Sequence, residues 1–152
     1  MTQTSAQTKH QVPGRDLAEA EAAETDLSVP IASTAQLARA VGDLVGAAIR
    51  DQVLLMFLDA RQRVMPLLLP AEGFRLGDPL DDGEVRTLAE LAGEVSGTID
   101  AKGVVVVWER IGGRRLTVGE RGVVDRLAAH FPRGAVALRA QYLCHSLGVV
   151  TL

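Results

Sequence analysis

The adjacent residues Cys144 and His145 combine a thiol with an imidazole, two groups that act together in nucleophilic catalysis. Activation of the thiol requires that the imidazole accept its proton across a direct contact. Neighbouring side chains on a strand point to opposite faces of a sheet, and these two residues stand at the end of a predicted strand. The pattern therefore favours a structural role for both, and the sequence predicts no catalytic residue.

Metal ligands are sparse in this chain, which has 3 His and 1 Cys. Zinc requires three or four such donors held together, and no pair of them has the spacing of a zinc site. Aspartates could surround a magnesium ion, but in Gly/Pro-rich loops they usually form turns or cap helices. The candidates of this kind are Asp59, Asp78, Asp81 and Asp82. We therefore predict no metal and no cofactor.

A glycine- and arginine-rich segment, residues 112–115, separates a predicted strand from a predicted helix. A turn of this kind favours an anion, because the first N–H groups of the helix point towards it. Guanidinium groups add paired donors for carboxylate or phosphate. The alternative is a tight connection with solvent-facing arginines, and neither the phosphate-loop nor the dinucleotide glycine pattern is present. The predicted anion-binding residues are Arg110, Arg114, Arg115 and Thr117.

Length and composition indicate one globular domain. A chain of 152 residues can bury a core without cross-links, and its single cysteine excludes an internal disulfide and suits a reducing compartment. No signal pattern opens the chain, and no apolar run is long enough to span a bilayer. We therefore expect a bacterial, cytoplasmic protein that does not enter the membrane.

Charge is distributed unevenly along the chain. Residues 1–30 carry five acidic side chains against two basic ones, which accounts for the net charge of -3. Few large apolar residues occur there, so residues 1–32 are predicted to be a flexible acidic tail and residues 33–152 a single domain. Residues 103–152 instead hold seven arginines against three acidic residues. These arginines could form a basic face that attracts an acidic partner, or simply a solvated surface.

Hydrophobic periodicity predicts eight elements in the order α-β-β-α-β-α-β-β. The helices are expected at 33–48, 81–97 and 117–131, and the strands at 53–58, 64–69, 104–107, 136–143 and 148–152. Interleaved helices and strands of this kind predict a three-layer α/β domain with a mixed sheet.

Details within these elements predict their ends and their faces. Asp81 with Glu84, and Thr117 with Glu120, resemble capping boxes. Pro66 indicates an edge strand or a bulge, because proline cannot donate to a sheet. Two sets of residues are predicted to face the core, and Trp108 to be a half-buried anchor. The sets are Val124, Leu127, Ala128 and Phe131 in the last helix, and Val136, Leu138, Ala140 and Tyr142 in the strand after it, the latter opposite exposed Arg139 and Gln141.

The segment 51–64 (DQVLLMFLDARQRV) resembles the opening hairpin of the RadC branch of the JAB/MPN metallopeptidase-like fold. Residues 117–152 are similar to the closing helix and last two strands of that family, so the resemblance covers about residues 35–152. It implies a JAB/cytidine-deaminase-like architecture.

In that family a His-x-His pair and a later Asp hold zinc, and an upstream Glu acts as general acid and base. The corresponding positions here are Trp108, Arg110 and Arg114, with Asp51 near the position of the Glu. Tryptophan offers no lone pair to a metal, and arginine stays protonated. The resemblance therefore implies a member that has lost the metal and its hydrolytic chemistry.

Together these observations favour a non-catalytic JAB-like domain that acts by protein binding or homo-oligomerisation. One alternative is a nucleic-acid or DNA-repair accessory protein, which draws on the C-terminal arginines and on the usual link of the RadC branch to DNA repair. The low aromatic content and negative net charge weigh against it. A second alternative is an anion-binding enzyme with an unrecognised site near the arginines.

Overall fold

The computed structural model describes residues 26–131 and 136–152. Within them the elements follow one another in the predicted order. They are α2 (Thr34–Val45), β2 (Gln52–Leu58), β3 (Val64–Pro70), α3 (Asp82–Ile99), β4 (Gly103–Glu109), α4 (Val118–His130), β5 (Ala137–His145) and β6 (Gly148–Thr151).

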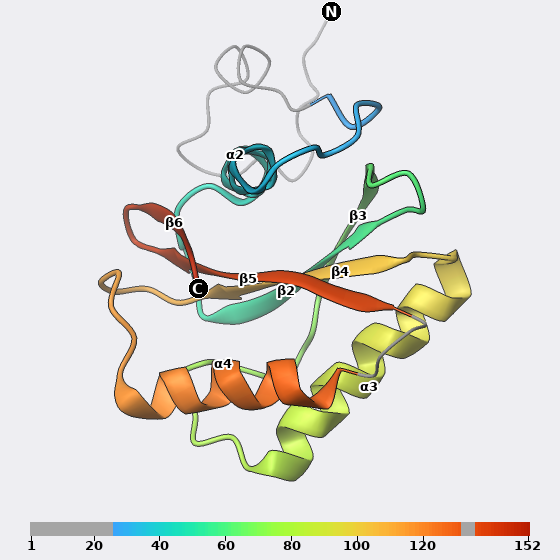
Figure 1. Cartoon of the computed structure of the whole chain (residues 1–152). Coiled ribbons are helices and arrows are strands. Elements are labelled where there is room, and N and C mark those ends of the chain that lie inside the picture. The colour runs from blue at the N-terminus through green and yellow to red at the C-terminus, as the bar shows by residue number, and fades with distance from the viewer. Residues whose placement is uncertain (1–25, 132–135) are drawn as a thin grey trace, which may run out of the picture.

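A mixed sheet of five strands, in the order β3-β2-β4-β5-β6, forms the middle of the domain (Figure 1). The central strand β4 is antiparallel to β2 and parallel to β5, and β2–β3 and β5–β6 are antiparallel pairs. Because β4 and β5 run in the same direction, the chain must cross over between them, and α4 makes that connection. The strands β4 and β5 therefore end, and β2 and β6 begin, at one edge of the sheet. We call this the carboxyl edge.

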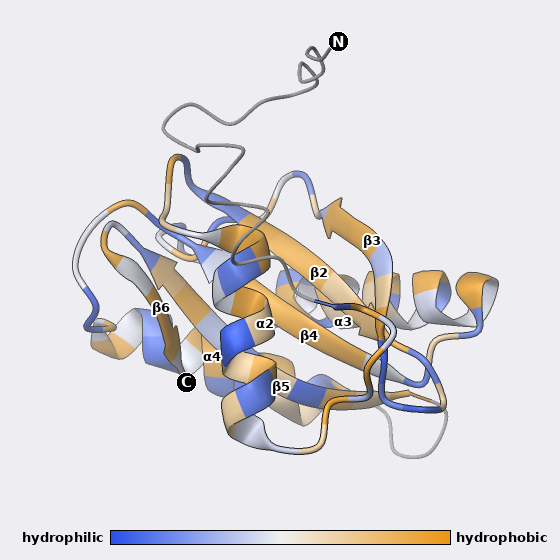
Figure 2. Ribbon diagram, turned by 90° about the horizontal axis from the view of Figure 1, so that it is seen from above, coloured by the Kyte–Doolittle hydropathy of each residue, from blue (hydrophilic) through white to orange (hydrophobic). Residues whose placement is uncertain are grey.

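Helices cover both faces of the sheet: α2 lies on one face, and α3 with α4 on the other (Figure 1). The strands β2 and β4 are hydrophobic along their length (Figure 2), as burial on both faces requires. One buried cluster contains Leu55, Val106 and Trp108 with side chains of α3 and α4. The other contains Val105 and Val107 with side chains of α2. The predicted single α/β domain with a mixed sheet between helix layers is confirmed.

Helix starts agree with the capping patterns in the sequence. Asp81 Oδ1 accepts from Glu84 N at 2.8 Å, and Thr117 Oγ1 accepts from Glu120 N at 3.0 Å. In both boxes the glutamate carboxylate accepts a hydrogen bond from the backbone N–H of the cap residue. Ser33 caps α2 through Gln36 N. Each cap satisfies a donor that the first turn of a helix leaves free.

The strand β3 lies at an edge of the sheet, as Pro66 predicts. Its pairing with β2 also shifts between Leu58–Val64 and Met56–Leu68, so an irregularity surrounds the proline. Ala71 N donates to Val53 O at 2.8 Å. Because donors alternate along an antiparallel strand, the backbone groups of Leu68 and Pro70 face away from β2. We call the side of β3 that faces away from β2 its free side. Pro70 has no backbone N–H, so it cannot donate a hydrogen bond on that side.

The predicted alternation of β5 is wrong in two places. β4 pairs Val104 with Leu138 but Val105 with Ala140, so Arg139 is an extra residue in β5. A bulge reverses which face each later residue occupies. Leu138 therefore packs on the α3/α4 face, while Ala140 packs on the α2 face. Gln141, predicted to be exposed, is only 7% exposed.

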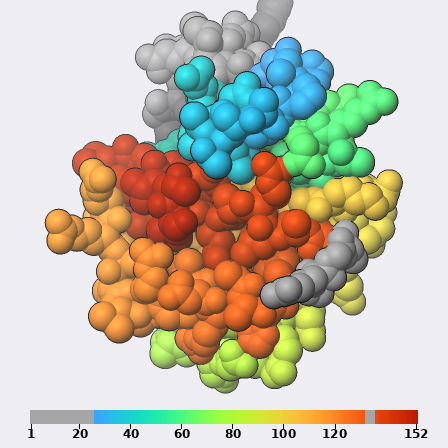
Figure 3. Space-filling view, in the orientation of Figure 1, coloured from blue at the N-terminus to red at the C-terminus, as the bar shows by residue number. Residues whose placement is uncertain are grey.

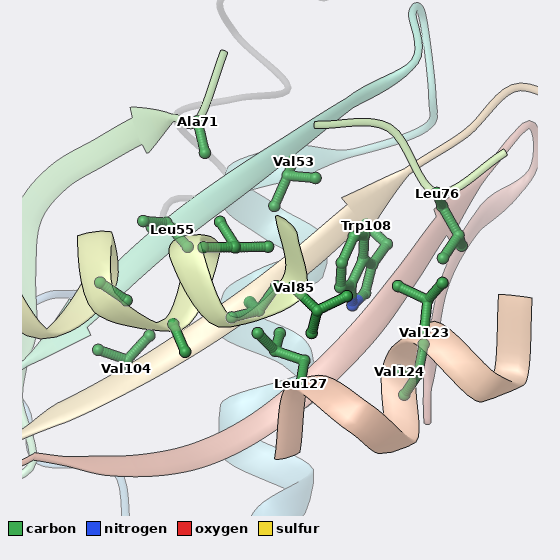
Figure 4. Close-up of a cluster of buried hydrophobic side chains, with 14 of the residues drawn as sticks. Val53, Leu55, Ala71, Leu76, Val85, Val104, Trp108, Val123, Val124 and Leu127 are labelled. Atoms are coloured by element: carbon green, nitrogen blue, oxygen red, sulfur yellow. The ribbon is translucent and has the colours of Figure 1, made fainter. Parts of the chain in front are cut away.

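The packing between β4 and α4 corrects two further predictions. Trp108, predicted to be half-buried, is fully buried, and its indole points from β4 towards Val123 and Leu127 of α4 (Figure 4). In α4 the buried set includes Val123, whereas Ala128 is exposed. Val124, Leu127 and Phe131 pack on this face as predicted, so the error is confined to Ala128 and the omission of Val123. An alanine carries little information about which face is buried.

The predicted acidic tail lies mostly outside the described residues. Pro132 and Gly134, at which the sequence also predicts the end of the last helix, lie outside them as well. Of the described part of the tail, Leu27 and Ile31 pack against the cluster beneath α2. Ile31 N also donates to Gln62 O in the β2–β3 turn at 2.8 Å. Residues 27–31 therefore pack against the domain, although the sequence analysis predicts that they belong to the flexible tail. No helix among the described residues is both long and apolar enough to cross a membrane.

Candidate functional site

Loops from four strands meet at the carboxyl edge, the place where α/β sheets commonly bind ligands. The loop before β2 reaches it through Ala48, whose N–H donates to His145 O at 2.9 Å. The loop after β4 reaches it through Arg110, whose N–H donates to Cys144 O at 2.9 Å. The polar side chains at this edge are therefore the candidates for chemistry.

Glu109, at the end of β4, is the most deeply buried carboxylate at this edge, with 3% exposure. Its Oε2 accepts from the N–H groups of Ile49 at 2.8 Å and Arg50 at 3.3 Å. Its Oε1 accepts from Gln52 Nε2 at 2.8 Å. These donors compensate the carboxylate for its lost hydration, and the carboxylate in turn fixes the loop that enters β2. No local pattern indicates this role of Glu109, because its partners lie about sixty residues away in the chain.

Arg110 forms an ion pair with Glu120, with Nε and Oε2 2.8 Å apart. Its guanidinium also donates to the carbonyls of Gly113 at 3.1 Å and Arg115 at 3.0 Å. Glu120 meanwhile accepts from Thr117 N at 2.9 Å as part of the α4 capping box. One charge pair therefore folds the whole 110–117 loop back onto the start of α4.

The four predicted anion-binding residues are separated by this arrangement. Arg110 and Thr117 are brought together, but Glu120 lies between them and already supplies the carboxylate that both of them bond. Arg114 and Arg115 have exposed side chains. Arg110 is thus committed to a structural role, and anion binding stays a prediction that now concerns Arg114 and Arg115.

At the positions that the family resemblance assigns to a zinc site, Trp108 and Asp51 form hydrogen bonds with other parts of the chain. The Trp108 indole lies in the core under α4, where Nε1 donates to Gln141 Oε1 at 2.8 Å. Asp51 Oδ1 accepts from Ile111 N at 3.0 Å. No group of three or more His, Cys, Asp or Glu residues is placed to hold a metal within residues 26–131 and 136–152.

Three of the four aspartates considered for magnesium have partners in a turn, in a helix cap or in an ion pair. Asp59 accepts from the backbone N–H groups of Arg61 and Arg63 in the β2–β3 turn. Asp81 caps α3, and Asp82 pairs with His130 Nε2 at 2.8 Å. The hydrogen bond from His130 holds the pKa of Asp82 below its ordinary value.

Cys144 and His145 take different partners, as their positions on β5 predict. Cys144 Sγ donates to Gly46 O at 3.2 Å, within the cluster beneath α2. His145 Nδ1 accepts from Leu147 N at 3.2 Å in the turn that leads to β6. Both side chains therefore hold neighbouring backbone in place.

A cleft of about 500 Å³ lies beside the start of α4. The loop at residues 76–80 forms one wall, and its floor is apolar because Leu76, Leu80 and Val123 are buried there. Arg126 spans the cleft and donates to Leu80 O at 3.2 Å. The cleft is thus bridged by the protein's own hydrogen bonds.

Three exposed aliphatic side chains lie in the loops at the carboxyl edge. Ile49 is 51% exposed, Ile111 57% and Leu147 91%. Exposed arginines accompany them, and the loop after β4 projects at the left of the molecule in Figure 3. We call this the carboxyl-edge surface and define it by Ile49, Ile111, Leu147, Arg50, Arg114 and Arg115.

Comparison of the chain with protein-family models, with curated proteins and with solved structures finds no match.

Proposed function

We propose that this chain is a non-catalytic JAB-like domain that acts by binding protein, either a second copy of itself or another partner. The observation that carries the proposal is the use of polar groups at the carboxyl edge. Glu109, Arg110 and Asp51 all bond the chain's own loops there, where the resemblance places a reaction centre. The side chains exposed at that edge include three aliphatic ones and three arginines.

Exposed aliphatic side chains that lie close together release water when a partner covers them. Leu147 is 91% exposed and Ile111 is 57% exposed, and a hydrogen bond joins their neighbours Ser146 and Gly112. A rigid surface loses little entropy on binding. An apolar patch with an arginine rim has the composition of a protein interface.

Nucleic-acid binding receives less support from the same surface. Single strands are bound by stacking bases on exposed aromatic rings. Among the described aromatic residues Phe57, Trp108 and Tyr142 are fully buried, and none lies in the carboxyl-edge surface. The exposed arginines alone would favour nucleic acid and acidic protein equally.

The proposal is tested by two measurements on the full chain. The first assays hydrolysis of peptide and isopeptide substrates with and without added zinc, and we expect no zinc-dependent activity. The second places a photo-reactive amino acid at Leu147 or at Ile111. The control position is Glu90, an exposed residue of α3. We expect the first two positions to cross-link the same protein, identified by mass, and Glu90 not to do so.

Either of two results would contradict the proposal. Zinc-dependent hydrolysis would show that the domain retains chemistry. Equal cross-linking at Glu90 and Leu147, or none at any position, would show that the carboxyl edge is no binding surface.

A further inference from the structure

We infer that the carboxyl-edge surface binds an acidic, aliphatic segment, and that its occupant is residues 16–26 of a second copy of this chain. The inference rests on the proposed function and names the partner for the same surface. It depends on four observations: the rigidity of the surface, its charge, the sequence of the segment, and the place where the segment joins the domain.

Three loops are tied together to make the surface one unit. Ile111 N donates to Asp51 Oδ1 at 3.0 Å, which joins the loop after β4 to the loop before β2. Gly112 N donates to Ser146 Oγ at 2.9 Å, and Ser146 N donates to Gly112 O at 3.1 Å. The aliphatic side chains of the surface each lie next to one of these bonded residues or, for Ile49, on a backbone held by Glu109.

The surface carries an excess of positive charge. Its exposed arginines, Arg50, Arg114 and Arg115, form no ion pair within the residues that the structure describes. Of the nearby carboxylates, Glu109 and Glu120 are buried and already bonded. Asp51 is exposed but accepts a hydrogen bond from Ile111 N, so three arginines stand against one exposed carboxylate. Guanidinium groups that lack partners favour carboxylates, because the fork of donors matches two oxygens. The surface therefore fits a chain that offers carboxylates and small apolar side chains together.

Residues 16–26 of this chain have that composition. The segment reads DLAEAEAAETD and holds five acidic residues, no basic residue, one leucine and four alanines. Carboxylates alternate with aliphatic side chains along its length. No other stretch of eleven residues in the chain combines five acidic residues with none of opposite charge.

The place where the segment joins the domain favours a second copy. Ile31 is bonded to Gln62 in the β2–β3 turn, and Leu58 beside that turn pairs with Gly103, the first residue of β4. The carboxyl edge lies at the far end of β4, about 20 Å away for a strand of seven residues. An extended chain needs about six residues to cross that distance, so on its own domain the segment could lay only its first few residues on the surface, whereas on a second copy its whole length is available. Two copies that exchange these segments make the contact twice around a two-fold axis, as symmetric dimers do.

The test is sedimentation velocity on the full chain over about two decades of concentration. Arg114→Glu with Arg115→Glu reverses the surface, and Glu19→Lys with Glu21→Lys and Glu24→Lys reverses the segment. Either set should weaken the dimer by more than about tenfold, because like charges then face each other. Combining both sets should restore most of the affinity. Raising the salt from about 50 mM to about 500 mM should weaken the wild-type dimer, since exposed charges are screened.

The matched control is Arg61→Glu with Arg75→Glu, two exposed arginines outside the surface, which should leave the dimer unchanged. A wild-type chain that stays monomeric at every concentration would overturn the inference. So would a dimer that tolerates the Arg114 and Arg115 reversals, or one that the combined variant fails to restore. If cross-linking from Leu147 then captures a different protein, the proposed function survives while the second copy is excluded. If cross-linking also fails, both fall.

Discussion

The indole Nε1 of Trp108 donates a hydrogen bond to Oε1 of Gln141 at 2.8 Å, across the two parallel strands at the centre of the sheet. The amide of Gln141 donates in turn to the Val124 carbonyl in α4 at 2.9 Å. A single buried glutamine therefore links β4, β5 and the helix that connects them.

Gln141→Leu should lower the free energy of unfolding by about 1–3 kcal/mol, because the buried indole N–H then lacks an acceptor. The side chain is 7% exposed, so water cannot replace the amide. Chemical denaturation measures the loss. In a Trp108→Phe background the same change should cost less, since the donor is already gone. Equal costs in both backgrounds would show that the bond contributes little.

Glu120→Ala should be more damaging, at about 3–5 kcal/mol, because it leaves Arg110 largely buried without its counter-charge. The side chains of Arg110 and Glu120 are only 14% and 9% exposed. Removing both charges, as Arg110→Met with Glu120→Leu, should cost less than Glu120→Ala alone. Thermal unfolding of the three variants compares them. A double variant less stable than Glu120→Ala would mean that the pair acts through packing rather than charge.

Thr117→Ala should lower stability by about 1 kcal/mol, because Glu120 N loses its capping oxygen. Thr117→Ser keeps the hydroxyl and serves as the matched control, with an expected change close to zero. The denaturation midpoint measures both. A serine variant as unstable as the alanine variant would place the effect in the lost methyl group instead.

Stability should depend on pH through Asp59. Hydrogen bonds from the Arg63 backbone and then the Arg61 backbone, with the Arg63 guanidinium, hold the pKa of Asp59 below its ordinary value of 3.8, against the opposing effect of burial. A carboxylate with a lowered pKa in the folded state stabilises the fold above its ordinary pKa. That contribution is lost as the pH falls through the lowered value.

The free energy of unfolding of the wild type should therefore exceed that of Asp59→Asn near neutral pH. The difference should shrink as the pH falls below about 4. Urea denaturation of both proteins across this range measures it. A difference that stays constant with pH would exclude the ionised carboxylate as the source of the stability.

Features that depend on residues close in sequence were predictable. The two capping boxes each join residues three positions apart, so Asp81 and Thr117 mark the starts of α3 and α4 correctly. The edge position of β3 followed from the missing donor of Pro66. Continuous apolar runs identified β2 and β4, because strands buried on both faces need no alternation.

Features that depend on distant partners were not predictable from one chain. The bulge at Arg139 is visible only through the pairing of β5 with β4, and it moves Gln141 from solvent into the core. The sequence predicts that Arg110 binds an external anion, whereas in the structure it binds the carboxylate of Glu120, ten residues later in the capping box of α4. An arginine shortly before a capping box could have suggested that pairing.

The free side of β3 has a further consequence. The segment 64–70 (VMPLLLP) is apolar and uncharged, and Leu67 and Leu68 are 37% and 39% exposed. An uninterrupted strand of this composition at a sheet edge would be a template on which further chains could stack into fibrils. Growth of that kind needs an N–H at every second position, and Pro70 has none to give while Pro66 stands in a distorted stretch. The two prolines therefore oppose fibril formation at the point where the leucines would otherwise promote it.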